Sequence, residues 1–327
     1  MQKFWGTLVA LFLAIGTSSA GVGRSNVDLI TTIIAGIPHA QFFGLTFNEG
    51  RGIAVGAKGA IFESGDAGKS WSQVKESPTR DAFLSVSSRG KYSVAVGQTG
   101  LVAVSAGLGK WELGDSGSES RLMVVDVNES GLAFAAGEFG VVLQSSDGGR
   151  SWSSSGPDWS SLAIEDHFGT GEPSIYGAWL SNTGQITLAG EYGLIVRSDD
   201  AGITWRVLRA MDPKASTLHA LFIQGQGTSY AVGQEGELLL STDGGENWSS
   251  RRIATDLNFL GISAAPNGNV VITGMRVMYR SQDAGKTWQP VLEGDTTTDW
   301  YQTVRTEAKT GKMYAVGHSG RIIRIGS

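Results

Sequence analysis

A short element that recurs seven times constrains this chain more than any other feature. Each copy is a small or β-branched residue followed by Gly-x-x-Gly, and successive first glycines are 41, 40, 53, 43, 41 and 43 residues apart. Six copies are intact and begin at Val55, Val96, Ala136, Ala189, Val232 and Val316, whereas a seventh at Thr273 lacks the second glycine. A period near 40 residues with several short β runs per unit predicts an array of four-stranded sheets.

The second unit shows the strands expected of one such sheet. Its β runs span residues 83–87, 92–96, 101–105 and 111–113. The second and third runs of the units are rich in valine and alanine at both odd and even positions, so both faces of each sheet are expected to be covered. With 47 glycines in 327 residues, tight turns between short strands are favoured over helices. We predict an all-β protein, a seven-bladed β-propeller of four-stranded antiparallel blades.

The two ends of the chain predict how the ring closes. The last unit has strands at 301–306, 313–316 and 321–325 and then stops one strand short. An apolar β run at 27–34 (VDLITTII) precedes the first inner strand at Phe42. We expect this N-terminal strand to complete the last blade, because pairing the two ends leaves no open sheet edge.

A second motif, Ser-x-Asp-x-Gly-x-(Ser/Thr/Asn)-Trp, follows most Gly-x-x-Gly elements. It begins at Ser64, Ser145, Ser198, Ser241 and Ser281, and the second unit keeps only Ser105 and Trp111. The aspartates invite a catalytic or calcium-binding interpretation. An aspartate before glycine in a turn, however, accepts hydrogen bonds from its own turn. Because the motif recurs in unit after unit while a functional site occurs once, we favour the structural role. These aspartates are Asp66, Asp147, Asp200, Asp243 and Asp283.

This motif resembles the Asp-box, or BNR, repeat of sialidase-like propellers. Joined to the preceding element, as in VGAKGAIFESGDAGKSW and VGQEGELLLSTDGGENW, it is more specifically similar to the propeller family of photosystem II stability and assembly factors and their relatives in non-photosynthetic bacteria. The resemblance covers residues 42–325. It implies a seven-bladed, non-enzymatic propeller in the lumen or periplasm that holds a membrane-protein subunit during assembly. The chain lacks the lipidation cysteine of cyanobacterial members, and nothing in it identifies a photosystem.

Residues 1–20 have the layout of a secretory signal peptide, with Lys3, an apolar run at 4–15 and small residues ending at Ala20. The apolar run is shorter than the ~20 residues of a membrane-spanning helix, so cleavage is favoured over a permanent anchor. We expect residues 21–327 to form a single propeller domain in the periplasm or outside the cell, or in the thylakoid lumen of a photosynthetic organism.

Composition excludes several classes of site. The absence of cysteine removes disulfides, cysteine-ligated zinc and thiol catalysis, and the four histidines lie far apart, so we predict neither a metal site nor a cofactor. The net charge of −5 would repel a phosphate backbone, which argues against a nucleic-acid partner.

One face of the predicted ring varies between units. Antiparallel blades place the Gly-x-x-Gly tips on the face opposite the aspartate motifs. The longest unit has ~12 extra residues within 153–174, and these are expected on the same face as the tips. This insertion also contains Glu165, Asp166 and His167. Because binding residues collect on loops of a rigid scaffold, we predict a protein-binding face for a periplasm-exposed segment of a membrane protein. Its expected residues are Lys58, Arg80, Arg121, Glu138, Phe139, Trp159, Glu191, Tyr192, Glu235, Arg276 and His318.

An enzyme is the alternative, as a sialidase-like glycosidase or a glycan-binding propeller. A sialidase needs a tyrosine nucleophile with a nearby glutamate, an acid/base aspartate and several arginines for the substrate carboxylate. Glu191 and Tyr192 supply the first pair only superficially, and only Arg80 and Arg121 occupy matching positions at the start of inner strands. We therefore predict no enzymatic activity. The arginines that follow two motif tryptophans are expected to charge exposed edge strands, although a partner could dock there: Arg206, Arg209, Arg251 and Arg252.

Overall fold

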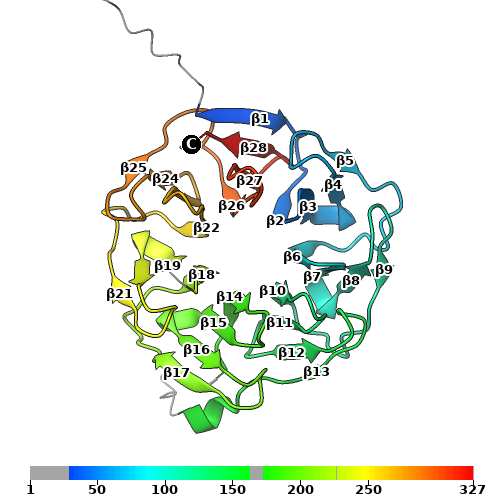
Figure 1. The fold of residues 1–327 in the computed structure, drawn as a ribbon, viewed down its shortest axis with the longest axis vertical. Helices are drawn as coiled ribbons and strands as arrows, with labels where there is room; N and C mark the ends of the chain where they lie inside the picture. The colour runs from blue at the N-terminus through cyan, green and yellow to red at the C-terminus, as the bar shows by residue number, and fades with distance from the viewer. Residues whose placement is uncertain (1–28, 163–171, 226, 327) are drawn as a thin grey trace, which may run out of the picture.

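The chain is a seven-bladed β-propeller (Figure 1). The computed structural model describes residues 29–162, 172–225 and 227–326. The predicted signal peptide and the residues Glu165, Asp166 and His167 lie outside these ranges. Seven four-stranded antiparallel sheets surround one axis, as the repeat count predicted.

Two strands of each sheet form its inner half. The innermost strands surround the axis and are β2 (Phe42–Asn48), β6 (Phe83–Arg89), β10 (Leu122–Val127), β14 (Ile175–Leu180), β18 (Leu218–Phe222), β22 (Phe259–Ala264) and β26 (Tyr301–Thr306). Their hairpin partners are β3 (Arg51–Gly56), β7 (Tyr92–Gly97), β11 (Ala133–Gly137), β15 (Ile186–Gly190), β19 (Ser229–Gly233), β23 (Val270–Gly274) and β27 (Met313–Gly317).

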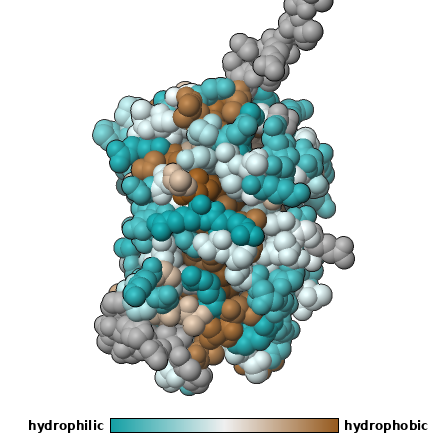
Figure 2. All heavy atoms as spheres, turned by 90° about the vertical axis from the view of Figure 1, so that its left-hand side faces the viewer, coloured by the Kyte–Doolittle hydropathy of each residue, from teal (hydrophilic) through white to brown (hydrophobic). Residues whose placement is uncertain are grey.

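The outer half is shorter and more polar. The third strands are β4 (Ile61–Ser64), β8 (Val102–Ser105), β12 (Val142–Ser145), β16 (Ile195–Ser198), β20 (Leu238–Ser241), β24 (Met278–Ser281) and β28 (Ile322–Ile325). The outermost strands are β5 (Ser72–Gln73), β9 (Glu112–Leu113), β13 (Ser153–Ser154), β17 (Arg206–Arg209), β21 (Ser249–Ser250), β25 (Gln289–Pro290) and β1 (Ile30–Ile34). Three of these outermost strands, β5, β13 and β21, consist of two polar residues, and such short polar edges limit unwanted pairing with other chains. Figure 2 shows mostly hydrophilic residues on the outer wall near β21 and β25, with apolar bands between them.

The ring closes through the ends of the chain. Strand β1 pairs antiparallel with β28, in the sheet order β1-β28-β27-β26, so the prediction of an N-terminal closing strand is confirmed. The Tyr314 hydroxyl donates to the Ala67 carbonyl over 2.9 Å and Thr303 Oγ1 donates to the Phe43 carbonyl over 2.8 Å. These bonds join the last blade to the first, so the ring has no gap at this junction.

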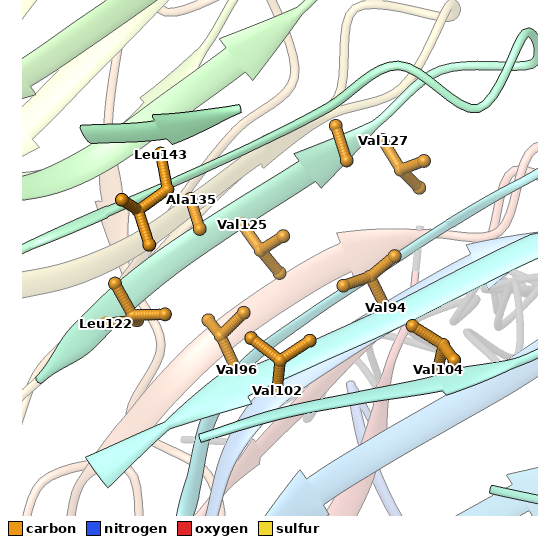
Figure 3. Close-up of a cluster of buried hydrophobic side chains, with 10 residues drawn as sticks. Val94, Val96, Val102, Val104, Leu122, Val125, Val127, Ala135 and Leu143 are labelled. Atoms are coloured by element: carbon orange, nitrogen blue, oxygen red, sulfur yellow. The ribbon is translucent and has the colours of Figure 1, made fainter. Parts of the chain in front are cut away.

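The core lies between blades rather than around the axis. Between the second and third blades, valines of β7 and β8 face apolar residues of β10, β11 and β12 (Figure 3). Val94, Val102 and Leu122 are at most 1% exposed. This packing explains the valine-rich and alanine-rich runs, because each sheet is covered on both faces by its neighbours. Each blade therefore depends on the next for its stability.

The five complete serine-aspartate motifs form similar turns, which we call the aspartate turns. In the first, Asp66 accepts hydrogen bonds from the Ser70 hydroxyl (2.6 Å), the Ser70 N–H (2.9 Å) and the Ser64 hydroxyl (2.9 Å). The Trp71 indole N–H donates to the Gly68 carbonyl over 3.1 Å. The carboxylate is therefore occupied by its own turn, as the structural interpretation predicts.

Stability should fall in acid because of these turns. The hydroxyl groups of Ser70, Thr204 and Thr287, followed by backbone N–H groups, lower the pKa of Asp66, Asp200 and Asp283 to about 2. A carboxylate whose pKa is depressed in the folded state stabilises the fold above its unfolded pKa of ~3.9, and that contribution is lost as the pH falls toward 2.

We expect the thermal midpoint of Asp200→Asn to depend less on pH between 4 and 2 than that of the wild type. Asp256→Asn, which replaces an exposed aspartate outside the turns, is the control. An identical pH dependence in the wild type and Asp200→Asn would show that the turn carboxylate does not carry this effect.

Candidate protein-binding face

Every Gly-x-x-Gly tip crosses closely over the start of its own inner strand. The residue after the first glycine donates its N–H to the carbonyl that precedes the inner strand, over 3.0–3.2 Å in all seven blades. A Cβ atom on the first glycine would lie 1.8–2.2 Å from that same carbonyl oxygen. Only glycine fits, which explains why the first glycine is present in all seven repeats.

The second middle residue of each tip has a left-handed backbone. Its φ lies between 50° and 57° at Lys58, Thr99, Phe139, Tyr192, Glu235, Arg276 and Ser319. This conformation is strained for residues other than glycine, at a cost of order 1 kcal/mol each. The turn therefore presents one non-glycine residue per blade on a fixed backbone. We call the surface made by these tips and the starts of the inner strands the tip face.

Exposed apolar and cationic side chains occur on the tip face. Phe139 is 67% exposed and Met275 is 46% exposed. Lys58, Arg80 and Arg276 are exposed and make no ion pair with any residue that the structure describes. The other charges are paired within the face, Arg121 with Glu138 at 2.8 Å and Glu235 with Arg252 at 3.0 Å.

An apolar pocket of about 370 Å³ opens on the tip face where the last blade meets the first. Its walls include Ile34, Ile37, Pro38, Phe42, Ala60 and Phe62, and Lys58 lies at the same pocket. Ile37 is 69% exposed. Arg80 belongs to the neighbouring blade. The residue before it, Thr79, lies close to Gly59, which is next to Lys58, because a Cβ atom on Gly59 would lie 2.0 Å from the Thr79 carbonyl oxygen. The pocket thus has an apolar interior with cationic groups beside it.

Comparison with known proteins finds no family model that matches this chain. The photosystem II assembly lipoprotein Ycf48 of Synechococcus sp. (strain CC9902) is 30% identical over 107 residues, which cover 31% of this chain and 32% of that protein. Two solved structures superpose over most of the ring. Ycf48 bound to D1 peptide has a TM-score of 0.67 and 18% identity, covering 92% of this chain and 97% of the other. Ycf48 from Cyanidioschyzon merolae has a TM-score of 0.69 and 16% identity, covering 91% and 98%.

The chain resembles Ycf48 in fold over most of the ring and in sequence over about a third of its length. The local sequence match and the shared fold agree with the resemblance drawn from the repeat motifs. The match in sequence spans only about a third of the cyanobacterial lipoprotein. The fold is also shared with an enzyme, the GH74 xyloglucanase of Xanthomonas campestris, at a TM-score of 0.68 and 14% identity over 89% of this chain and 52% of the other.

Two residues expected on the tip face are instead buried. Trp159 is 7% exposed, and its indole N–H donates to the Gly140 carbonyl over 3.0 Å. The indole therefore packs against the tip of the third blade. His318 is also 7% exposed, with Nε2 at 2.8 Å from Asp295 and Nδ1 at 3.4 Å from Asp299. Both side chains pack inside the protein, so we remove them from the set of contact residues.

Asp295, Asp299 and His318 form a group with the spacing of metal ligands, and it is the one such group in the described part of the chain. Asp295 already accepts a hydrogen bond from the Tyr301 hydroxyl over 2.7 Å and pairs with Arg321. A guanidinium group on the same carboxylate supplies the positive charge that a metal would provide. We therefore interpret the group as an ion-pair network that anchors the last tip.

Glu191 lies beside a tyrosine of an inner strand. Glu191 accepts the Ser174 N–H over 3.0 Å, and the tyrosine beside it in space is Tyr176 of the inner strand β14. Burial, followed by the charge of Glu191, raises the pKa of Tyr176. Tyr176 precedes the repeat motif, so an analysis aligned on the tips could not find it.

The arginines of the outer strands are largely occupied. Arg206 pairs with Asp199 at 3.0 Å and Glu246 at 2.9 Å, while Arg209 donates to the Gly193 carbonyl. Arg252 pairs with Glu235, which leaves Arg251 as the exposed cation of the group without an ion pair to a described residue. These contacts fit the predicted structural role at the edge better than a docking surface.

Proposed function

We propose that this protein is a non-enzymatic assembly factor that binds a segment of another protein on its tip face. The observation that carries the proposal is the 370 Å³ apolar pocket with Lys58 at its edge and Arg80 on the adjacent blade. The similarity to Ycf48, one structure of which holds a D1 peptide, supports a peptide ligand. An extended segment with an apolar side chain next to an acidic residue would complement the pocket and its cations.

The contact residues follow from exposure and pairing. We propose Lys58, Arg80 and Arg276 as main contacts because they are exposed and make no ion pair with a described residue, and Phe139 because it is an exposed apolar side chain. Arg121, Glu138, Glu191, Tyr192 and Glu235 lie at the same face and would shape the surface around them. One extended segment could then cross several blades.

We further propose that the partner is an exported segment of a membrane protein in the cell envelope. The proposal rests on the signal-peptide pattern of residues 1–20 and on the resemblance to assembly factors. In the part of the chain that the structure describes, no helix is long and apolar enough to cross a membrane. Residues 21–327 would then act as one propeller domain after cleavage.

Charge reversal on the tip face should abolish partner capture. We expect Lys58→Glu/Arg80→Glu/Arg276→Glu to recover at least ~10-fold less partner than the wild type after crosslinking in the living cell, since a favourable charge pair becomes repulsive. The readout is mass spectrometry of the crosslinked protein. The matched control reverses three exposed lysines away from the tips, Lys69→Glu/Lys110→Glu/Lys286→Glu, and should recover the same partner as the wild type.

A photo-crosslinking residue tests the face independently. Placed at Ile37 it should capture the partner, and placed at Ile203, which is 81% exposed in an aspartate turn, it should not. Equal partner capture by Lys58→Glu/Arg80→Glu/Arg276→Glu and the wild type would reject the assignment of the tip face. Capture only by the photo-crosslinking residue at position 203 would reject it as well. Failure to capture any envelope protein with the wild type would reject the proposed partner.

A further inference from the structure

The channel along the propeller axis has a narrow middle and a wide mouth. The narrow part has a volume of about 70 Å³ and is lined by the centres of the seven inner strands. The mouth has a volume of about 430 Å³ and opens between the hairpin turns at the end opposite the tips. Arg305 of β26 lines both spaces, so its side chain lies at the neck between them. We call the wide space the axial mouth.

The guanidinium group of Arg305 is largely unpaired. The structure gives it one hydrogen bond, from Nη1 to the Val304 carbonyl over 2.9 Å, although a guanidinium has five N–H donors. Burial lowers the pKa of Arg305, with the charge of Asp126 opposing this effect and that of Arg89 adding to it. Arg305 is half-buried, and its unused donors are open to the channel, where a ligand or water can accept hydrogen bonds from them.

The nearest acid, Asp126, is committed to holding three blades together. It accepts the Ser87 hydroxyl over 2.7 Å from the second blade and the Leu180 N–H over 2.8 Å from the fourth. It also accepts the Val127 N–H over 3.0 Å. Arg89 stands 3.8 Å from the same carboxylate, beyond hydrogen-bonding distance. Arg89 and Arg305 therefore both face the mouth with donors to spare.

The walls and rim of the axial mouth restrict what could bind there. Phe47, Trp179 and Phe222 supply aromatic wall, while Glu49 and Glu129 are exposed at the outer turns. With Asp126 included, three acidic groups accompany the two arginines, so a polyanion such as phosphate or citrate would be repelled more strongly than an anion with one negative charge. A single carboxylate could reach the arginines at the floor while its apolar body covers the aromatic wall.

We propose that the axial mouth binds an organic monocarboxylate with an apolar or aromatic body, held by Arg305 and Arg89. This site lies at the opposite end of the axis from the tip face and does not depend on the proposed protein partner. The carboxylate could belong to a free small acid or to the C-terminus of a peptide, since both present the same group.

Ligand-observed NMR with a matched pair of probes tests the site. N-acetyl-L-phenylalanine should show saturation transfer from the full chain, whereas its C-terminal amide, which has the same body without the charge, should not. Arg305→Gln should weaken binding of the acid ~10-fold or more, the loss typical of one charge-assisted hydrogen-bonding partner. Arg280→Gln, on β24 and outside the axial mouth, is the control and should bind as the wild type does.

Other arms separate the sources of the carboxylate and guard against misfolding. A tripeptide that ends in phenylalanine should bind more tightly than the free acid if a chain end is the natural ligand, and no more tightly if a small acid is. Arg89→Gln removes an exposed side chain and should also weaken binding, so the test stands even if Arg305→Gln fails to fold. Equal binding of acid and amide, competition by phosphate, no binding of any probe, or unchanged binding in Arg305→Gln or Arg89→Gln would overturn the proposal.

Discussion

Removal of residues 21–36 is expected to abolish cooperative folding of this protein. The deletion takes away β1, whose Ile30 packs on one apolar cluster while Ile33 and Ile34 pack on another. Partial burial of these side chains and Leu29 contributes roughly 4 kcal/mol at ~1 kcal/mol each, against a total stability of ~5–15 kcal/mol for a typical protein. The loss also leaves β28 as an open apolar edge, which favours aggregation.

The matched control for this deletion is removal of residues 21–28, which leaves β1 whole. Circular dichroism during heating should show a cooperative unfolding transition for the control and none for the longer deletion. Size-exclusion chromatography should show aggregates for the longer deletion but not for the control. A longer deletion that melts at the wild-type temperature would show that closure by β1 does not stabilise the ring.

Gly56→Ala should be among the most destabilising single changes in the first blade. The added Cβ would lie 1.9 Å from the Gln41 carbonyl oxygen, and that oxygen is held by a 3.0 Å hydrogen bond from the Ala57 N–H. The tip must therefore lift away from the inner strand, which breaks this bond and disturbs the pairing of Phe42 with residue 56. We expect a loss of ~3 kcal/mol or more in the free energy of unfolding, at the upper end for overpacked sites.

Gly65→Ala, in the same blade, is the control. No atom lies within 4 Å of a Cβ at this position, and its φ is not in the left-handed region, so alanine should be neutral or stabilise by up to ~1 kcal/mol. Urea unfolding followed by tryptophan fluorescence measures both variants. Similar free energies of unfolding for the two would show that close contact at the tip does not explain the recurring first glycine.

The repeated parts of the fold were predictable because one pattern is tested seven times in the same sequence. The strands expected at 83–87, 92–96 and 301–306 correspond to β6, β7 and β26, with differences of at most two residues at their ends. The expected closing strand at 27–34 corresponds to β1 at Ile30–Ile34. Glycine spacing and strand composition are local properties, so they can be read without knowing what packs against what.

The candidate sites were only partly predictable, because they depend on side chains from segments distant in sequence. Trp159 and His318 looked like exposed loop residues, yet a carbonyl of the third blade and two aspartates of the preceding connection bury them. The pocket beside Lys58 includes Ile37 and Pro38, which lie outside every repeat. No periodic signal marks such residues.

The sequence alone determined the number of blades, the antiparallel strands and the position of the tips, since each follows from local spacing repeated along the chain. Only the tertiary structure placed Arg305 and Arg89 at one axial mouth and committed Asp126 to neighbouring blades. Ring closure brings the first and last blades together, and the charge and shape of the axis are sums over all seven inner strands, which no single repeat contains.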